Sequence, residues 1–493
     1  EVEACYTGPT GTLDVGACQG GMWTCNADGK GFGPCEGETT PVVEDCGTLA
    51  DDDCDGSKSC ACSPAWENVF GSPGNDDIGD VATDALGNVY IASRFNGSVT
   101  LAQGTSHTSN GKVDVLVAKM TPDGKIIWSK AFGGNENDRP FAIAVTSTGD
   151  VVVGGLFESV VNFGGGNVNG GSGGAAFLLR LKADGSFSNV VMLDGATSEF
   201  LLDVAVDAVG NAYAVGFYSG TFTAGDKTVM PLANPEGFVA KVSTGAVVEW
   251  VNNVSGSGAQ RVDGVAVDGA GNVYIAGAFE NTIDLGDGAH ISKGASDALL
   301  AQLAPDTGIA KWSKVFGGPG SQWGVRVGIA ATDVVVGGVF DGTIDVGGTI
   351  LNENSAGDDI YVARLSASGM GSPIWVKQFG STEDDRLEGM TIELDSNVLL
   401  AGSFQASISF GGSTLTSNGG HDAFFARLSA AGVHVCSRSF GGNQAQVGRA
   451  VAAGMAGAAY LGGEFAGNVN FGFGGHSTPS NGDLNAFLLR LNP

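Results

Sequence analysis

The sequence has few basic residues and few histidines. Of its 493 residues, 24 are Lys or Arg, 53 are Asp or Glu and 5 are His, so the net charge is −29. Nucleic acids and anionic membranes are bound through basic surfaces, and this composition argues against both. Long apolar runs are missing too, since none approaches the roughly 18 residues of a membrane-spanning helix. The sequence therefore predicts no nucleic-acid partner and no membrane span.

Recognised catalytic signatures are equally scarce. The sequence contains no His-Glu-x-x-His zinc motif, and no phosphate-binding loop or dinucleotide-binding fingerprint stands out. On these grounds we predict that the chain has no catalytic residues and is not an enzyme.

Cysteine is concentrated near the start of the chain. Nine cysteines are present, and eight of them fall within residues 5–62, a segment with almost no apolar core. Such crowding predicts disulfides in place of a core, and an extracellular or cell-surface location. A zinc site is the weaker alternative, because the segment has no His and no C-x-x-C pair. Cys436 stands apart, and we expect a buried small apolar residue or a disulfide to the N-terminal segment or another subunit. The predicted disulfide cysteines are Cys5, Cys18, Cys25, Cys35, Cys46, Cys54, Cys60 and Cys62.

The remainder of the chain repeats one unit. Runs of apolar or small residues that end in Phe recur every 60 to 64 residues, with the Phe at positions 95, 157, 217, 279, 340, 404 and 465. A second apolar run follows each of them, and a third begins with Trp in most copies, as at Trp128 and Trp312. An Ala- and Val-rich run precedes each Phe-ended run. Gly, Asn, Asp and Ser separate the runs, which indicates four short strands in each unit.

Four-stranded units of this kind bury their faces by stacking radially around an axis. We therefore predict an all-β fold: a seven-bladed β-propeller over residues 64–493 and a small disulfide-rich module over residues 1–63. The C-terminus supplies only three strands of the last unit, so residues 65–70 are expected to complete it and close the ring. The expected blades span residues 78–132, 139–193, 200–254, 261–316, 323–379, 386–440 and 447–491 with 65–70.

Several stretches resemble known families. The motifs WSKAFGG, AVDGAGNVYIAGAF and SFGGSTLTSNGGHDAFFARL resemble the bacterial β-propeller repeat family of extracellular and cell-surface proteins. This resemblance covers residues 64–493 and implies surface, adhesion or scaffold functions. The stretches TCNADGKGFGPCEGE and EDCGTLADDDCDG resemble the Cys- and Asp-rich metal-binding module of myxobacterial surface proteins. That resemblance implies an envelope or extracellular setting and a divalent metal.

An acidic run in the N-terminal segment has the alternating carboxylates of a calcium loop. Ca²⁺ takes roughly six to eight oxygen ligands, which alternate carboxylates can direct at one ion. The acidic residue that usually closes such a loop is replaced by Cys62, so an acidic residue before the loop is expected to complete the site. A solvated acidic loop is the alternative. The predicted Ca²⁺ ligands are Asp51, Asp53, Asp55 and Ser57, with Glu44 or Asp45.

The loops that join consecutive repeats carry many charged residues. If the propeller has a ligand site, its geometry places that site at these loops around the axis, where a cation or a glycan would bind. Solvation of the loops is the alternative. The residues of this predicted ligand face are Asp76, Asp77, Glu136, Asp138, Arg139, Arg261, Asp384, Asp385 and Arg386.

These patterns predict a secreted or cell-surface protein with a non-catalytic binding or structural role, in adhesion or as a scaffold. Its expected partner is a surface protein, a glycan or another copy of the chain. One alternative is a self-assembling extracellular filament or matrix subunit linked through the N-terminal module. A second alternative is an enzyme that acts on glycans.

Overall fold

The computed structural model of the chain describes residues 2–8, 13–15, 17–26, 28, 30–40, 62–171, 173–195, 198–233, 235–354, 357–478 and 483–493. Two compact units are present, Pro64–Leu491 and a smaller one made of Glu1–Ser63 with Asn492–Pro493. In the smaller unit, β1 (Val2–Cys5), β2 (Gly21–Cys25) and β3 (Phe32–Glu36) form an antiparallel sheet in that order. A disulfide between Cys5 and Cys35 joins its two outer strands.

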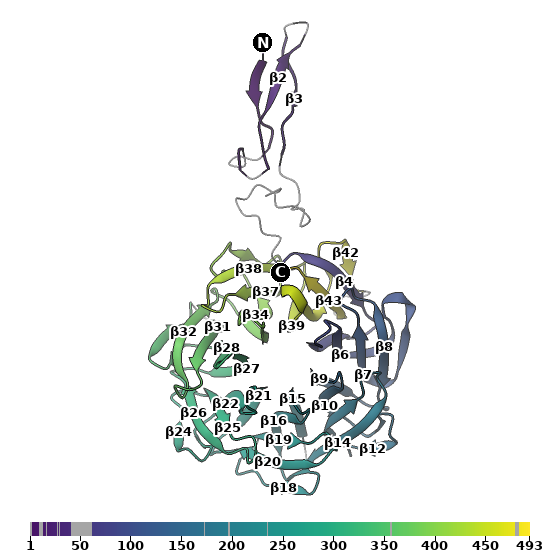
Figure 1. Cartoon of the computed structure of the whole chain (residues 1–493), viewed down its shortest axis with the longest axis vertical. Coiled ribbons are helices and arrows are strands. Elements are labelled where there is room, and N and C mark those ends of the chain that lie inside the picture. Colours follow the sequence, from purple (N-terminus) through teal and green to yellow (C-terminus); the bar gives the residue numbers. More distant parts are fainter. Residues whose placement is uncertain are drawn as a thin grey trace. The chain divides into compact units, whose positions relative to one another are not determined.

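The larger unit is a ring of β-sheets around a central opening (Figure 1). Each sheet has four main strands, and the innermost strand of each comes first in the lists that follow. Three sheets are β5 (Asp77–Thr83), β6 (Val89–Thr100), β7 (Ser106–Met120) and β8 (Ile126–Phe132); β9 (Asp138–Val145), β10 (Val151–Phe157), β13 (Ala175–Leu181) and β14 (Phe187–Gly195); and β15 (Ser198–Val206), β16 (Ala212–Ser219), β19 (Glu236–Val242) and β20 (Val248–Val254). The next two are β21 (Gln260–Val267), β22 (Val273–Phe279), β25 (Asp297–Leu303) and β26 (Ala310–Phe316); and β27 (Gln322–Ala330), β28 (Asp333–Phe340), β31 (Asp359–Ser366) and β32 (Ser372–Phe379). The last two are β33 (Arg386–Ile392), β34 (Val398–Phe404), β37 (Asp422–Leu428) and β38 (His434–Phe440); and β39 (Gln446–Ala453), β40 (Ala459–Phe465), β43 (Asn485–Leu491) and β4 (Pro64–Phe70).

Short hairpins and turns decorate these sheets. The β17–β18 hairpin extends the β9–β14 sheet at its outer edge, and the other hairpins form two-stranded sheets of their own. Within the described residues the helical segments are two short 3₁₀ turns, and no helix is long and apolar enough to cross a membrane. These elements are β11 (Val160–Asn162), β12 (Asn167–Asn169), β17 (Phe222–Ala224), β18 (Lys227–Val229), β23 (Thr282–Asp284), β24 (Ala289–Ile291), β29 (Thr343–Val346), β30 (Thr349–Asn352), β35 (Ser407–Ile408), β36 (Leu415–Thr416), β41 (Asn468–Asn470), β42 (Gly475–Ser477), η1 (Ala102–Gly104) and η2 (Met455–Gly457).

The second and third strands of the sheets are apolar on both faces. Every residue of β22 and of β25 is buried. A strand with one face in water alternates between apolar and polar residues, so continuous burial means that neighbouring sheets cover both faces. In one such layer, Tyr213 and Val239 pack with Ile275 and Leu299 of the next sheet. The hydrophobic core is therefore divided into layers between adjacent sheets.

The first and last strands of the larger unit lie in the same sheet. β4 pairs antiparallel with β43, which places Trp66 opposite Arg490 and Phe70 opposite Ala486. The Phe70 ring is 6% exposed and packs in a cluster that also contains Ile78 of β5. The two ends of this unit are thus tied together by a β-ladder and by a hydrophobic layer.

Among the described residues, the cysteines differ from the prediction at Cys25. Cys18 and Cys62 are disulfide-bonded, and so is Cys436, which is buried on β38. Cys25, which was expected in a disulfide, is a free thiol. The chain has nine cysteines, an odd number, so they cannot all pair with one another. Because Cys436 takes part in a disulfide, there is no longer a reason to expect all eight N-terminal cysteines in disulfides. Three predicted disulfide cysteines lie outside the described residues, namely Cys46, Cys54 and Cys60.

Each innermost strand contains a β-bulge. At one position per strand the pairing with the second strand skips a residue, for example Asp263 between Val262 and Gly264. A skipped residue leaves the ladder and can turn its side chain away from the sheet. The skipped residues are Gly79, Phe141, Leu202, Asp263, Val325, Glu388 and Arg449.

Candidate functional site

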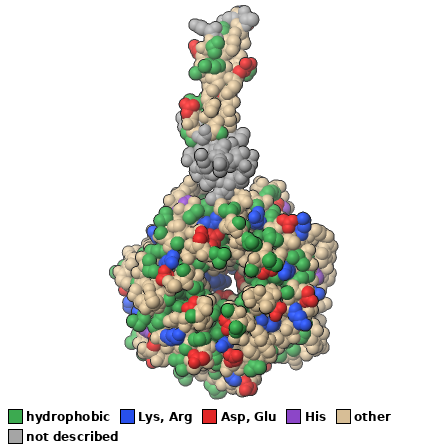
Figure 2. All heavy atoms as spheres, viewed as in Figure 1, with side chains coloured by type: hydrophobic (Ala, Val, Ile, Leu, Met, Phe, Trp, Pro, Cys, Tyr) green, Lys and Arg blue, Asp and Glu red, His purple; other side chains and the backbone are tan. Residues whose placement is uncertain are grey.

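The bulges of all seven innermost strands surround a single hollow of about 330 Å³. Figure 2 shows the opening at the centre of the larger unit, with acidic and basic side chains around it. Five of the eleven arginines of the chain line this hollow, in a protein whose acidic residues outnumber its basic residues more than two to one. Besides the bulge residues, the wall contains Asp77, Arg94, Arg139, Pro140, Arg261 and Arg326.

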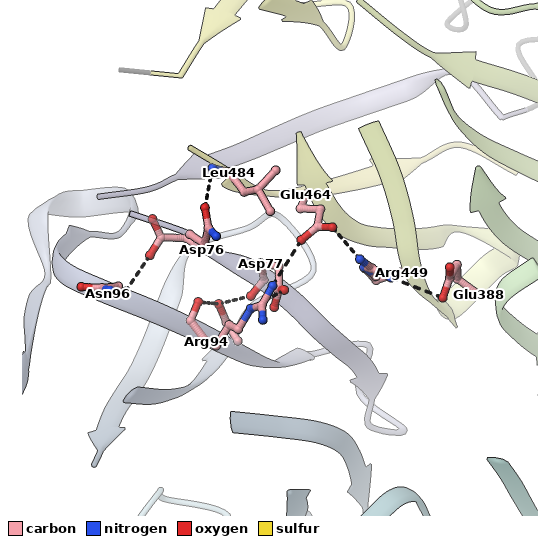
Figure 3. A network of polar contacts seen from close by, with 10 residues as sticks. Asp76, Asp77, Arg94, Asn96, Glu388, Arg449, Glu464 and Leu484 are labelled. Atoms are coloured by element: carbon pink, nitrogen blue, oxygen red, sulfur yellow. Dashed lines mark hydrogen bonds and ion pairs between the residues drawn. The ribbon is translucent and has the colours of Figure 1, made fainter. Parts of the chain in front are cut away.

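One part of the wall is a chain of alternating charges (Figure 3). Arg94 on β6 contacts Asp77 on β5 at 2.5 Å and Glu464 on β40 at 3.7 Å. Arg449 on β39 contacts Glu464 at 2.6 Å and Glu388 on β33 at 3.4 Å. The network therefore links three neighbouring sheets at the wall of the hollow.

Asp77 has an unusual protonation equilibrium within this network. Burial raises the pKa of the Asp77 carboxyl to about 7; the charge of Arg94 opposes this rise, and that of Glu464 adds to it. Burial disfavours the charged form of Arg449, yet Glu388 and Glu464 hold the pKa of Arg449 above its ordinary value. A carboxyl with a pKa of about 7 exchanges a proton near neutral pH, whereas Arg449 remains a cation.

Two other carboxylates connect neighbouring innermost strands. Asp80 accepts the backbone N–H of Ile143 at 2.8 Å, and Asp203 accepts that of Val265 at 2.8 Å. Burial and the negative charge of Asp203 together raise the pKa of Asp80 to about 7, against the opposing effects of the Ile143 N–H and of the Arg326 charge. Because both carboxylates are occupied by backbone donors, their contacts serve to hold the ring of inner strands together.

Arg139 is the arginine of the hollow that has neither an ion pair nor a hydrogen bond within the described residues. Arg261 donates from Nε to both carboxylate oxygens of Asp263 at 2.8 and 3.0 Å, and Arg326 donates to the backbone carbonyls of Asp263 and Val325 at 3.3 and 3.1 Å. Arg139 makes no ion pair within the described part of the chain, and its Nε is buried without a hydrogen-bond acceptor. A buried donor without an acceptor costs free energy, so this guanidinium is available to an anion.

Apolar side chains lie beside Arg139 in the wall. Pro140 follows it on β9, and Phe141 and Leu202 occupy bulges of β9 and of β15. An arginine binds a carboxylate through paired N–H donors, and an apolar wall binds the rest of an organic ligand. The hollow therefore suits a small organic anion, with a titratable carboxyl on its charged side.

Three residues of the predicted ligand face line this hollow, namely Asp77, Arg139 and Arg261. Three others organise the turns that enter the innermost strands. Asp76 accepts the Ser72 N–H at 2.6 Å, Asp138 accepts the Gly134 N–H at 2.7 Å, and Asp385 accepts the Ser381 N–H at 2.6 Å. Burial raises the pKa of these three carboxyls to about 6, 7 and 7, respectively.

The remaining residues of the predicted face form exposed or half-exposed ion pairs away from the hollow. Glu136 contacts Lys112 at 2.6 Å. Arg386 contacts Asp384 at 3.6 Å, and it lines a neighbouring hollow that also contains Asp358. Glu136, Asp384 and Arg386 therefore do not line the central hollow.

Sequence reasoning missed several residues of this site. Arg94 lies on a second strand, whereas Arg326, Glu388 and Arg449 lie inside innermost strands rather than in the loops that were searched. A charged residue inside an otherwise apolar or small-residue strand was the available signal, as in the QVGRAVAA stretch around Arg449.

The predicted calcium site falls outside the described residues. Its ligands Asp51, Asp53, Asp55, Ser57, Glu44 and Asp45 all belong to the undescribed range 41–61. In the part of the chain that is described, no group of three or more His, Cys, Asp or Glu side chains could hold a metal ion.

Several solved structures are similar to this chain at low identity. No family model matches the chain, and no curated protein matches it. The quinohemoprotein alcohol dehydrogenase from Comamonas testosteroni is similar at 10% identity and a TM-score of 0.42, over 87% of this chain and 76% of that one. A europium-containing methanol dehydrogenase is similar at 9% identity and a TM-score of 0.40, over 87% and 93%. The Neurospora crassa Pan2 WD40 domain is similar at 11% identity and a TM-score of 0.34, over 67% and 92%. Because these identities and TM-scores are low, the all-β, propeller-like fold rests on the strand order of this chain itself.

Three predictions made from the sequence are corrected here. The predicted non-catalytic role in adhesion, scaffolding or filament formation is withdrawn: the similar solved structures include dehydrogenases, and a shared fold does not assign a role. The prediction that the chain is not an enzyme is withdrawn for the same reason, since missing sequence motifs do not exclude a site assembled from seven sheets. The prediction of a Ca²⁺ cofactor is withdrawn as well: its ligands lie outside the described residues, and the described residues hold no group of three or more side chains that could bind a metal ion.

Proposed function

We propose that the larger unit is an enzyme that binds a small organic carboxylate in the hollow lined by the seven bulges. It exchanges a proton with this substrate through Asp77. The observation that carries this proposal is the position of Arg139. This arginine has no acidic partner, and it lines the same hollow as a carboxyl whose pKa is about 7.

The two functional groups have complementary roles. Arg139 would hold the carboxylate of the substrate through paired N–H donors, while Pro140, Phe141 and Leu202 would contact its apolar part. A group whose pKa lies near the working pH is an efficient proton donor and acceptor, and Asp77 meets that condition. Glu464 and Arg94 would keep it there by their opposed charges.

We also infer that the sheets form a closed, seven-bladed propeller, supported by the β4–β43 pairing and by the seven equivalent bulges. The repeat motifs support membership of a bacterial propeller repeat family. The disulfides are consistent with an oxidising compartment such as the cell exterior or the periplasm. Association with a surface protein, a glycan or another copy of the chain stays a prediction from the sequence.

The experiment uses two probes with the full chain. Phenylacetate tests binding by calorimetry, and phenylpyruvate, whose CH₂ protons exchange, tests proton transfer by NMR in D₂O. Arg139→Met should weaken binding of both probes at least tenfold, which corresponds to about 1.4 kcal/mol for a charge-assisted contact. Asp77→Asn should preserve binding and abolish catalysed exchange. Lys112→Met, which removes an exposed ion pair, is the control and should change neither.

The outcomes separate the two halves of the proposal. If the parent binds neither probe, or if Arg139→Met binds them as tightly as the parent, the anion site is wrong. If both probes bind but exchange is no faster than in buffer, the enzymatic half is wrong and the hollow is a binding site.

A further inference from the structure

In five of the seven sheets, one side chain of the outermost strand reaches across to the next sheet. The indole N–H of Trp donates to a backbone carbonyl in the turn between the third and fourth strands of that neighbour. Where Asn189 replaces Trp, its amide makes the same bond to Thr244 at 3.2 Å. The Trp bonds are Trp66 to Pro122 at 3.0 Å, Trp128 to Ala183 at 3.1 Å, Trp250 to Pro305 at 3.1 Å and Trp375 to Ala430 at 3.0 Å.

Trp312 on β26 breaks this rule. Its side chain is 7% exposed, yet its indole Nε1 is buried without a hydrogen-bond partner. A buried donor without an acceptor is costly. In four other sheets the Trp indole donates to a backbone carbonyl of the neighbouring turn. By analogy, the acceptor that Trp312 lacks is a backbone carbonyl from the turn between β31 and β32.

The cause lies in two irregular turns of the β27–β32 sheet. Ser366 and Ser372 form an extra pair beyond Leu365 and Pro373, so this end of the hairpin is two residues longer than in the next sheet, where residues 429–433 directly separate the paired residues Leu428 and His434. The longer turn does not present a carbonyl to Trp312. In addition, residues 331–332 alone join β27 to β28, whereas residues 268–272 join β21 to β22.

These changes open a hollow of about 590 Å³ between the two sheets. Its charged residue, Asp268, is occupied by turn donors, because its carboxylate accepts the N–H groups of Ala270 and Asn272 and the Asn272 side chain. The other polar groups are neutral hydroxyls and amides. The lining residues that matter here are Tyr274, Gln302, Trp312, Thr332, Ser368 and Met370.

We propose that this hollow binds an uncharged peptide segment, one of whose backbone carbonyls accepts the Trp312 indole N–H. A peptide is favoured because four other indoles of the ring are satisfied by peptide carbonyls. Met370, which is 61% exposed at the rim, supplies an apolar contact. Since Nε1 is covered, residues 367–371 must move aside when the peptide binds.

The test uses the full chain with ¹⁵N-labelled indoles and the probe acetyl-Ser-Ala-Ala-Gly-Val-amide. This peptide copies residues 429–433, the turn that satisfies Trp375. The Trp312 indole resonance should shift saturably with peptide concentration, while those of the other six tryptophans stay in place. Trp312→Phe should weaken binding at least tenfold. Trp375→Phe removes an indole that already has an acceptor, so it is the matched control and should bind as the parent does.

A second variant keeps the test informative if Trp312→Phe is unstable. Replacing residues 366–372 with Ser-Ala-Ala-Gly-Val restores the shorter turn, so the chain supplies the carbonyl itself. This variant should lose peptide binding and melt at a higher temperature than the parent. The proposal fails if the Trp312 resonance does not respond to millimolar peptide, as expected if water alone satisfies the N–H. It also fails if the shortened turn or Trp312→Phe binds the peptide as the parent does.

Discussion

The carboxylates of Asp77 and Glu464 contact one and the same guanidinium, that of Arg94, at 2.5 and 3.7 Å. They come from β5 and β40, which lie in sheets formed by opposite ends of the repeat array. Two like charges at one cation in a buried place cannot both remain ionised without cost. The contact therefore makes the sheet that contains β4 and β43 part of the electrostatics of the central hollow.

This arrangement predicts a stability that depends on pH. The pKa of Asp77 is raised from 3.8 to about 7 in the folded chain, so the folded state binds this proton more tightly than the unfolded state. The resulting stabilisation is fully present below pH 3.8 and is lost as the pH rises through about 7. Asp80 and Asp138, whose pKa values are also raised to about 7, act in the same direction.

We therefore expect the chain to melt at a lower temperature at pH 8 than at pH 5, by calorimetry at constant ionic strength. Asp77→Asn should reduce this difference by roughly 2 °C or more, because it removes one of the contributing protons. Asp226→Asn is the control, since Asp226 is exposed and its pKa is lowered by Lys227. An unchanged pH dependence in Asp77→Asn would mean that Asp77 titrates normally.

A second prediction concerns the Phe-Gly-Gly motif. The first Gly packs against the carboxylate that begins the third strand of its sheet. A Cβ on Gly317 would meet the Asp297 carboxylate far inside van der Waals contact, and Asp297 is fully buried and accepts the Lys293 N–H at 3.1 Å. Gly317→Ala should therefore destabilise the chain by about 1–3 kcal/mol, as overpacking does, measured by thermal melting. Gly475→Ala, at a residue with open space around it, should be close to neutral, and equal effects of the two changes would refute the packing argument.

The free thiol gives a third prediction. Cys25 is half-buried and unbonded, whereas Cys5, Cys18, Cys35, Cys62 and Cys436 are in disulfides. Iodoacetamide added to the folded, unreduced chain should alkylate Cys25 and leave these five unmodified until a reductant is added. Peptide mass spectrometry reads the sites directly. Protection of Cys25 from alkylation without reductant would mean that it has a disulfide partner after all.

The all-β, propeller-like fold could be predicted from the sequence because Gly, Asn, Asp and Ser residues mark the turns between the apolar runs of each repeat. The Phe-ended run that stops at Phe279 is β22, and the outer run that starts near Trp312 lies within β26. The channel was harder to predict, because the bulges shift the register by one residue and reverse the direction of the side chain. Asp76 and Asp77 illustrate the limit: they are adjacent in sequence, yet Asp76 closes a turn and Asp77 lines the hollow.

The last prediction concerns how much β4 contributes to the stability of the larger unit. Phe70 on β4 and Phe316 on β26 occupy equivalent ends of outermost strands, opposite Ala486 and Ala298, and are 6% and 1% exposed. If β4 is as integral to its sheet as β26 is to its own, then Phe70→Ala and Phe316→Ala should each cost about 3–5 kcal/mol. Their melting temperatures should then fall by similar amounts, although β4 is far from β43 in sequence. A nearly neutral Phe70→Ala beside a destabilising Phe316→Ala would show that β4 is only loosely attached and that the ring does not depend on it.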